Sequence, residues 1–262
     1  MSSPRAATKA RHASLLALLR DGTTSVEELA ERVGVSESTV RRDLERLRAE
    51  GAVARTYGGA MVTAPFHERS ISESARQNHA AKAAIARAAL GLVPTEGLVF
   101  LDAGTTCGAL ARLLVDSGEH NERGTLTVAT RGLETAVALS DAEHIDVIML
   151  GGRLRRLSHG LVGPLVDLAI ERLAFDVAFL GADVVDPARG VGEPTLEETS
   201  VKELVAARSG RTVVLADGAK LTALPTPAWT RLDRGWTLVT DDPPLGLAER
   251  CAASGVELIA AS

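Results

Sequence analysis

The sequence lacks the features that mark several classes of protein. Its only cysteines are Cys107 and Cys251, too few for a disulfide scaffold or a cysteine-rich metal site, which indicates a reduced compartment. No apolar run approaches the ~20 residues that a membrane-spanning helix needs. The first residues, MSSPRAATKARH, have no apolar core of the kind found in a secretory signal. We therefore expect a cytoplasmic protein with no membrane partner.

Aromatic residues are also scarce, at 3% of the 262 residues, so leucine, valine and alanine must supply the core. A chain of this length can build two modest domains. The net charge of -5 disfavours nucleic-acid binding, but the charge is unevenly distributed. Residues 1–62 carry 10 basic and 8 acidic residues, whereas the remainder carries 19 and 26. Four arginines lie between positions 41 and 48, and such local placement matters more for a groove contact than the total charge.

The segment 25–60 has the pattern of two short amphipathic helices joined by a tight turn at Gly34. Ser25 with Glu28 fits a capping box at the start of the first helix, and Ser36 fits the N-cap of the second. The apolar stripes consist of Val26, Leu29, Ala30 and Val33 in the first helix and Val40, Leu44 and Leu47 in the second. At about 100° per residue, the outer face of the second helix carries Ser38, Thr39, Arg42, Glu45 and Arg46.

A helix with this outer face can lie in the major groove of DNA, because arginine pairs with guanine edges and hydroxyls reach bases or phosphates. The alternative is an ordinary helical hairpin with a solvated charged face. The Arg-Thr-Tyr-Gly-Gly run that follows favours DNA binding, since it has the composition of a β wing. We predict a winged helix-turn-helix over residues 6–62, with a first helix at 8–20. Its candidate DNA-binding residues are Ser36, Ser38, Thr39, Arg41, Arg42, Arg46, Arg55 and Tyr57.

Residues 97–262 follow a different pattern, in which short apolar strands alternate with helices. The predicted strands are 98–101, 126–130, 147–150, 177–180, 212–216, 236–240 and 256–259, and the main helices are 105–115, 133–139, 164–173 and 196–209. Apolar strands alternating with helices imply a mostly parallel α/β sheet covered on both faces. Residues 63–96 are predicted to form a linker and one long connecting helix at 66–92.

Nearly every predicted strand ends in glycine plus a polar or charged residue, at the sheet edge where ligands bind in such folds. The turn at Gly104 lets the backbone approach a ligand, and the helix after it presents N–H groups to an anion. The alternative is that Thr105 or Thr106 only caps that helix.

Cations at the other strand and helix ends could each be a solvated surface charge. Converging on one crevice, they could hold a phosphate, leaving acids to hold sugar hydroxyls. The candidate ligand-binding residues are Asp102, Gly104, Thr105, Thr106, Arg131, Arg153, Asp183, Glu197, Lys202 and Lys220.

The sequence has no pattern that indicates a cofactor, a metal ion or a nucleophile. Cys107 has no histidine nearby in the sequence, so we interpret it as a small buried residue. His144 and His159 lack the spacing of metal ligands. We therefore predict no cofactor, no metal and no catalytic residue.

Several short motifs are spread along the chain. The first part contains GVS at 34–36, STVRRDL at 38–44 and RTYGGA at 55–60. The second part contains the stretches 100–106, 126–130, 150–153 and 179–182, Glu197-Glu198 with Lys202, and Asp217 with Lys220. Together these motifs resemble the DeoR family of bacterial repressors over nearly the whole chain. The resemblance implies an effector domain similar in fold to ribose-5-phosphate isomerase that responds to phosphorylated sugars.

The chain departs from the usual pattern of that family at three positions. Arg131 stands where the family often has asparagine, Ala219 where it usually has serine, and Tyr57 where it often has histidine. Asp183 completes a Gly-Ala-Asp run like that of the isomerases. The extra cation at Arg131 suggests, as a hypothesis, a more anionic ligand with a second acidic group.

These features favour a ligand-responsive transcriptional repressor that binds operator DNA as a homo-oligomer, a dimer or a tetramer, because paired half-sites need paired heads. The helix at 66–92 would link the ligand to the head. The alternative is a sugar-phosphate isomerase that carries a DNA-binding head, with Asp183, Glu197 or Glu198 and a lysine moving protons. A general DNA-compacting protein is disfavoured, because the acidic second part repels phosphate.

Overall fold

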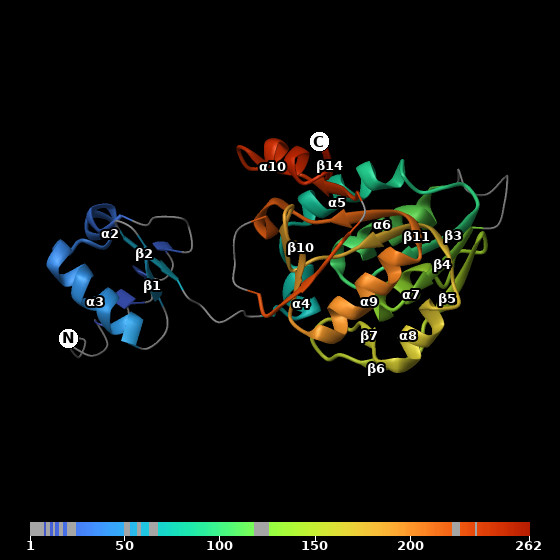
Figure 1. The fold of residues 1–262 in the computed structure, drawn as a ribbon, viewed down its shortest axis with the longest axis horizontal. Helices are drawn as coiled ribbons and strands as arrows, with labels where there is room; N and C mark the ends of the chain where they lie inside the picture. The colour runs from blue at the N-terminus through green and yellow to red at the C-terminus, as the bar shows by residue number, and fades with distance from the viewer. Residues whose placement is uncertain are drawn as a thin grey trace. The chain divides into compact units, whose positions relative to one another are not determined.

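Figure 1 shows the fold as a computed structural model. The structure describes residues 8, 11, 12, 14, 15, 18, 19, 25–49, 53–56, 59–62, 68–117, 126–221, 226–233 and 235–262. The chain divides into two compact units, Met1–His67 and Glu68–Ser262, called here the first and the second unit. None of the described helices is long and apolar enough to cross a membrane.

The first unit contains the two predicted helices followed by a two-stranded sheet. These elements are α2 (Val26–Val33), α3 (Glu37–Ala49), β1 (Val53–Thr56) and β2 (Gly59–Val62). The hydroxyl of Ser25 accepts the N–H of Glu28, and Gly34 ends α2 at φ 71°, a left-handed conformation that favours glycine. The strands pair antiparallel, which confirms the predicted wing. The described residues of the predicted helix at 8–20 are helical, namely Thr8, Arg11, His12, Ser14, Leu15, Leu18 and Leu19.

Among the described residues, the core of the first unit is aliphatic but includes the buried charge of Asp43. Its buried apolar side chains are Leu15, Leu19, Leu29, Ala30, Val40, Leu44, Leu47 and Val53. Asp43 lies on the inner side of α3, only 1% exposed, with its carboxylate 2.5 Å from Nε of Arg11 and 3.2 Å from Nε2 of His12. Burial alone would raise the pKa of Asp43, but these two neighbours hold it below its usual value. The ion pairs therefore tie α3 to the helical residues that precede it.

The second unit is built around a seven-stranded parallel sheet with the strand order β14-β13-β11-β8-β3-β4-β5. The strands are β3 (Gly97–Leu101), β4 (Leu126–Thr130), β5 (Ile145–Met149), β8 (Phe175–Leu180), β11 (Ser209–Leu215), β13 (Thr237–Thr240) and β14 (Glu257–Ala260). The predicted parallel α/β sheet is thus confirmed. The main difference is β11, which begins three residues before the predicted start, while β5 and β8 each begin two residues early.

Helices cover both faces of this sheet. They are α5 (His79–Leu90), α6 (Thr105–Asp116) and α7 (Leu133–Leu139) on one face, and α8 (Pro164–Ile170), α9 (Leu196–Ala207) and α10 (Leu247–Ala253) on the other. Side chains alternate along a strand. Val99 and Leu101 of β3 therefore pack against α5, α6 and α7, while Phe100 lies in the core on the side of α8, α9 and α10. The predicted helices 164–173 and 196–209 end earlier, at Ile170 and Ala207.

Several short elements beside the main sheet were not expected from the sequence. A three-stranded antiparallel sheet contains β9 (Val184–Asp186), β10 (Gly190–Glu193) and β12 (Ala228–Thr230), and a hairpin contains β6 (Arg153–Leu154) and β7 (Leu161–Val162). Strands of two to four residues give almost no periodic signal in a sequence. They matter because the loops between them carry residues of the site.

The single connecting helix predicted at 66–92 is wrong. Two helices occupy this stretch, α4 (Ile71–Ala75) and α5. Ser70 and Glu73 form a capping box that starts α4, and Asn78 adopts the left-handed conformation at φ 53° that separates the two helices. Because α5 packs against α6, the chain from Glu68 onward belongs to the second unit rather than to a separate connector.

Candidate functional sites

The outer face of α3 in the first unit is polar. Ser36, Ser38, Arg41, Arg42 and Arg46 are exposed, and Thr39 is half-buried. The hydroxyl of Ser36 lies 2.9 Å from that of Ser38 and 2.8 Å from that of Thr39, and it accepts the N–H of Thr39 at 3.3 Å. The N-terminus of α3 therefore presents a cluster of hydroxyls next to free helix N–H groups, which suits contact with phosphate.

The arginines of α3 differ in what they contact. Arg41 donates to Glu37 at 2.7 Å across one helical turn. Arg42 and Arg46 lie four residues apart on one face, and no described residue forms an ion pair with either. Their guanidinium groups can therefore bind guanine edges or phosphates. The side chain of Arg55 and the whole of Tyr57 lie outside the described residues, so their DNA contacts stay predictions.

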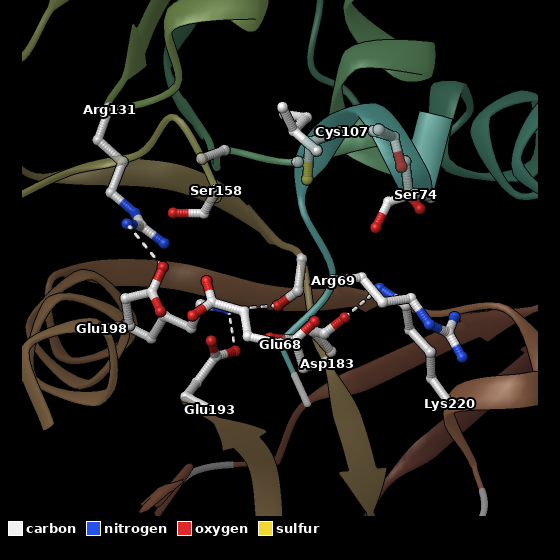
Figure 2. A pocket seen from close by; sticks show the side chains of 18 residues that line it. Glu68, Arg69, Ser74, Cys107, Arg131, Ser158, Asp183, Glu193, Glu198 and Lys220 are labelled. Carbon is white, nitrogen blue, oxygen red and sulfur yellow. Dashed lines mark hydrogen bonds and ion pairs between the residues drawn. The ribbon is translucent and has the colours of Figure 1, made fainter. Parts of the chain in front are cut away.

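A pocket opens in the second unit where β3, β4, β8 and β11 end (Figure 2). The enclosed part of this pocket has a volume of about 70 Å³, and the rest is open to solvent. Seven of the predicted ligand-binding residues line it, namely Gly104, Thr105, Thr106, Arg131, Asp183, Lys202 and Lys220. These residues are far apart in the sequence and come together because parallel strands end at one edge of the sheet.

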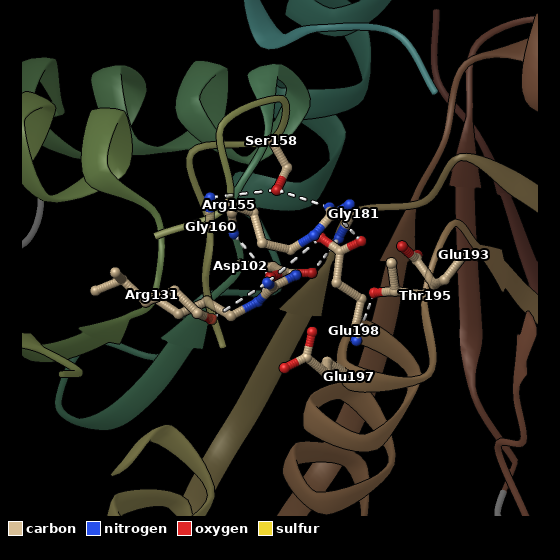
Figure 3. A network of polar contacts seen from close by, with 12 residues as sticks. Asp102, Arg131, Arg155, Ser158, Gly160, Gly181, Glu193, Thr195, Glu197 and Glu198 are labelled. Carbon is tan, nitrogen blue, oxygen red and sulfur yellow. Dashed lines mark hydrogen bonds and ion pairs between the residues drawn. The ribbon is translucent and has the colours of Figure 1, made fainter. Parts of the chain in front are cut away.

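Beneath this pocket lies a buried carboxylate, Asp102, which Figure 3 shows beside Arg131. Asp102 is fully buried and lies 2.6 Å from Nε of Arg131 and 3.4 Å from Nζ of Lys202. It also accepts the N–H groups of Ala103 at 2.8 Å and Gly181 at 3.2 Å. Burial alone would raise the pKa of Asp102, but the two cations hold it below its usual value. Asp102 is therefore a charged anchor beneath the pocket.

Arg131 is enclosed as completely as its partner. It is 2% exposed, and Nη1 lies 3.6 Å from Glu198 in addition to the contact with Asp102. Gly160 permits this placement, since a Cβ there would lie 2.6 Å from Nη1. Burial would lower the pKa of Arg131, but Asp102 and Glu198 raise it. Two carboxylates thus match this cation, so the geometry does not support the hypothesis that Arg131 requires a second acidic group on the ligand.

A second buried pair forms one side of the pocket. Nζ of Lys202 donates to Glu193 and, at 2.6 Å, to the carbonyl oxygen of Gly181. Burial would lower the pKa of Lys202, but Glu193 and Asp102 raise it, so the lysine stays charged. Burial raises the pKa of Glu193 to about 8, against the opposing effect of Lys202. Glu193 is thus a buried pocket acid whose pKa lies above its usual value.

The opposite end of the pocket can accept an anion. Gly104 (φ 114°) ends the turn from β3, and α6 begins at Thr105 with its N–H groups at the pocket wall. Lys220 donates Nζ to the carbonyl oxygen of Ala182, and no described carboxylate forms an ion pair with it. A lysine with spare donor capacity beside a helix N-terminus is a phosphate-binding arrangement.

Besides Asp102, which is buried beneath the pocket and does not line it, two predicted ligand-binding residues do not reach the pocket. Arg153 and Glu197 pair with each other at 2.6 Å on the surface, where their side chains are 63% and 45% exposed. Neither lines the pocket, because β6 and the first turn of α9 direct them outward. Their placement at the pocket was wrong; the neighbouring residue Glu198 lines it instead.

The sequence analysis also missed pocket residues that lie outside the strand ends. Glu68, Arg69 and Ser74 come from the beginning of the second unit, and Glu193 comes from β10. The Ser70–Glu73 capping signature was the available signal for the first group. Glu193 had none, because β10 is too short to predict.

The described residues also bear on metal and thiol chemistry. Among them, no group of three or more histidines, cysteines, aspartates and glutamates could hold a metal ion. Burial raises the pKa of the Cys107 thiol to about 12. Because the thiolate is the reactive form, Cys107 is not a nucleophile at neutral pH.

Models of two protein families match this chain. The model described as the DeoR-like helix-turn-helix domain matches residues 11–65, and that of the DeoR C terminal sensor domain matches residues 77–242. A putative aga operon transcriptional repressor of Escherichia coli O157:H7 is 31% identical over 257 residues, which cover 96% of this chain and 93% of that protein. The HTH-type transcriptional regulator GlpR of Haloferax volcanii is 35% identical over 198 residues, 75% of each chain.

Among solved structures, ribose 5-phosphate isomerase A of Methanocaldococcus jannaschii resembles part of the chain. The match has 22% identity and a TM-score of 0.39, and covers 54% of this chain and 53% of that protein. A likeness of this level carries no argument about the reaction or the ligand.

Proposed function

Because the chain belongs to the DeoR family of transcriptional regulators, we propose that it is a repressor whose binding to operator DNA is controlled by a phosphorylated sugar. The observation that carries this proposal is the pocket of the second unit, which combines a helix N-terminus, a lysine and carboxylates in one recess. The two relatives named above are a repressor and a regulator, so we do not favour the isomerase alternative.

For operator binding, we propose that α3 lies in the major groove. Arg42 and Arg46 would contact base edges or phosphates, because both are exposed and neither is paired with a described residue. Ser36, Ser38 and Thr39 would contact phosphate at the helix N-terminus. Arg41 donates a hydrogen bond to Glu37 and would therefore contribute less to DNA binding. The wing residues Arg55 and Tyr57 would contact the backbone beside the groove.

For the ligand, we propose that a phosphate group binds the N–H groups of Gly104, Thr105 and Thr106, with Lys220 as its counter-charge. Asp183 lines the same pocket and forms no ion pair with a described residue, so its carboxylate is available for sugar hydroxyls. The floor of the pocket would be held in shape by Asp102, Arg131 and Lys202. Their charges are paired within the protein, so they would not form ion pairs with the ligand.

The protein would act as a homo-oligomer, because two half-sites need two heads. Helix α8 is apolar on both sides: Val166 and Ile170 are buried, yet Leu165 and Leu168 are 65% and 48% exposed. Leu154 and Leu196, which are 45% and 78% exposed, are the sequence neighbours of the paired residues Arg153 and Glu197. A patch with leucines and one charge of each sign can face itself across a two-fold axis. We therefore propose that a second copy of this chain covers it.

Replacing Leu165 and Leu168 together by glutamate tests this contact. The variant is expected to sediment as a smaller species and to bind a paired half-site weakly, while a single half-site is still bound. Leu245→Glu is the matched control, since Leu245 is fully exposed just before α10, away from α8. If the double variant of Leu165 and Leu168 keeps the oligomeric state of the wild type, the proposed contact surface is wrong.

The proposed function as a whole is tested by operator binding. The full chain is mixed with DNA from upstream of its own gene, with and without ribose 5-phosphate, glucose 6-phosphate, fructose 6-phosphate or glycerol 3-phosphate. Each phosphate is paired with its unphosphorylated sugar or polyol as a control. We expect specific binding that one phosphate alters and its control does not. Specific binding that none of the compounds alters would contradict the proposed ligand and leave the DNA-binding role intact.

A further inference from the structure

One wall of the pocket is formed by the segment with which the second unit begins. Residues 68–75, called here the lead-in segment, contribute Glu68, Arg69, Ile71 and Ser74 to the pocket lining (Figure 2). In the sequence, only five residues separate Glu68 from Val62, the last residue of the wing strand β2. The lead-in segment is therefore both a wall of the ligand site and the chain that leads from the wing.

Arg155 attaches this wall to the floor of the pocket. Its guanidinium makes two hydrogen bonds to Glu68, Nη1 to Oε1 at 2.8 Å and Nη2 to Oε2 at 2.7 Å. The same Nη1 donates to Oε2 of Glu198 at 2.6 Å, and Figure 3 shows Arg155 beside this carboxylate. The side chains of Arg155 and Glu68 are only 11% and 12% exposed, so this paired fork is stronger than a surface ion pair.

The two ends of the lead-in segment are held differently. At its end, Lys82 donates Nζ to the carbonyl oxygens of Ser74 and Gln77, which fixes α4 to the buried face of α5. At its start, the described attachments are the Glu68–Arg155 pair and the N–H of Ile71, which donates to the carbonyl oxygen of Leu157 at 2.7 Å. The start can therefore detach while the end stays docked.

We infer that Arg155 is a positioning residue that clips the lead-in segment onto the pocket, so that ligand binding and docking of this segment are linked. This inference rests on the proposed function. A sugar phosphate in the pocket would contact the floor and the lead-in segment together, so it binds the docked arrangement better than the detached one. By the same linkage, the docked fraction sets the apparent affinity for the ligand. The ligand thus acts on the chain that leads to the wing without moving the sheet.

Loss of the Arg155–Glu68 clip should change operator affinity in a direction that can be stated in advance. Glu68→Gln removes the charge of one partner and Arg155→Lys removes the two-pronged contact, so both favour the detached segment. A ligand favours the docked segment. Each variant should therefore move operator affinity in the direction opposite to the ligand, whether the ligand weakens or strengthens binding. Apparent ligand affinity should fall as well.

Amide hydrogen exchange on the full chain tests the clip without any ligand. We expect exchange of the Ile71 amide, which donates to Leu157, to be about tenfold faster in Glu68→Gln and Arg155→Lys than in the wild type, with residues 74–76, α6 and α9 unchanged. Glu197→Gln is the matched control, because it breaks an arginine–glutamate pair of the same type on the surface. Unchanged exchange in both clip variants, or equal acceleration in α6, would overturn the inference.

Operator binding by the same three variants is then measured with and without ribose 5-phosphate, glucose 6-phosphate, fructose 6-phosphate and glycerol 3-phosphate. A clip variant that shifts operator affinity in the same direction as an active phosphate would also overturn the inference. A wild-type chain that binds no operator, or ignores every phosphate, would count against the proposed function instead, while the exchange result still decides whether the clip exists.

Discussion

The two units use charged residues in opposite ways. On α3 of the first unit, Arg42 and Arg46 point outward and no described residue pairs with them. In the pocket of the second unit, Arg131 and Lys202 are almost fully buried, and each has two carboxylates within reach. A surface that meets DNA must leave its cations available, whereas a buried cation needs partners to be stable at all. Cations are thus left available on α3 of the first unit and are held in ion pairs in the second.

The largest effect is expected on stability, when Arg131 and Arg153 are each replaced by alanine. Both arginines follow predicted strands, so the sequence alone does not distinguish them. Arg131→Ala removes one of the two cations that contact each of the buried carboxylates Asp102 and Glu198, and should lower the free energy of unfolding of the second unit by about 3–5 kcal/mol. Arg153→Ala breaks an exposed pair and should cost less than about 1 kcal/mol. Urea unfolding of the two full-length variants measures both. Equal free energies of unfolding for the two variants would contradict the distinction between buried and exposed arginines.

The next largest effect concerns the first unit. Arg42→Ala should weaken operator binding by about 1–3 kcal/mol, because it removes one guanidinium from the groove-facing side of α3. Arg250→Ala is the control, since Arg250 is exposed on α10 of the second unit and pairs with Asp186 at 3.2 Å. Fluorescence anisotropy with labelled operator reads out both variants. Binding of a sugar phosphate should be unaltered in Arg42→Ala, and its loss would show that the two units are not separable.

A smaller effect should appear with pH. Because the pKa of Glu193 is raised to about 8, the carboxyl is protonated below that pH and gains a negative charge as the pH rises through it. The pocket should then bind an anionic sugar phosphate more weakly, by about tenfold if the change in charge costs 1.4 kcal/mol. Calorimetric titration on both sides of pH 8 measures this change. Glu193→Gln should flatten the profile, and a variant that keeps the full pH dependence would assign it to another group.

No effect is expected in an assay for isomerase activity. Glu193 is suited by its pKa to exchange a proton, but Lys202 occupies its carboxylate, and Asp102 and Glu198 are held by arginines. The full chain incubated with ribose 5-phosphate should therefore form no ribulose 5-phosphate above the rate in buffer. Formation that disappears in Glu193→Gln would revive the enzyme alternative.

The sequence predicted most of the fold because its signals are local. The strand Leu126–Thr130 and the helix Leu133–Leu139 have the predicted bounds, since an apolar run and a glycine turn mark them directly. The helices and the wing of the first unit follow equally from Ser25, Gly34 and the spacing of the leucines. The break at Asn78 was missed, because the alanine-rich pattern on either side of it looks continuous.

The candidate site was predictable only in part, for a different physical reason. Gly104 and Lys220 reach the pocket because parallel strands end at one edge, which is a rule of topology. The partners of a buried charge depend on contacts across the chain: Arg155 and Glu68 are 87 positions apart, and Arg131 and Asp102 are 29 apart. Nothing near Arg131 or Arg153 in the sequence indicates that one is enclosed and the other exposed.

Different residues of α3 pack into the first unit and lie on its outer face. Val40, Asp43, Leu44 and Leu47 hold the helix in the first unit, and Asp43 does so through Arg11 and His12. Ser38, Arg42 and Arg46 contribute nothing to that core. On the proposed role of α3, exchanging these outer side chains should change the operator preference, while the fold of the first unit and the ligand of the second stay as they are.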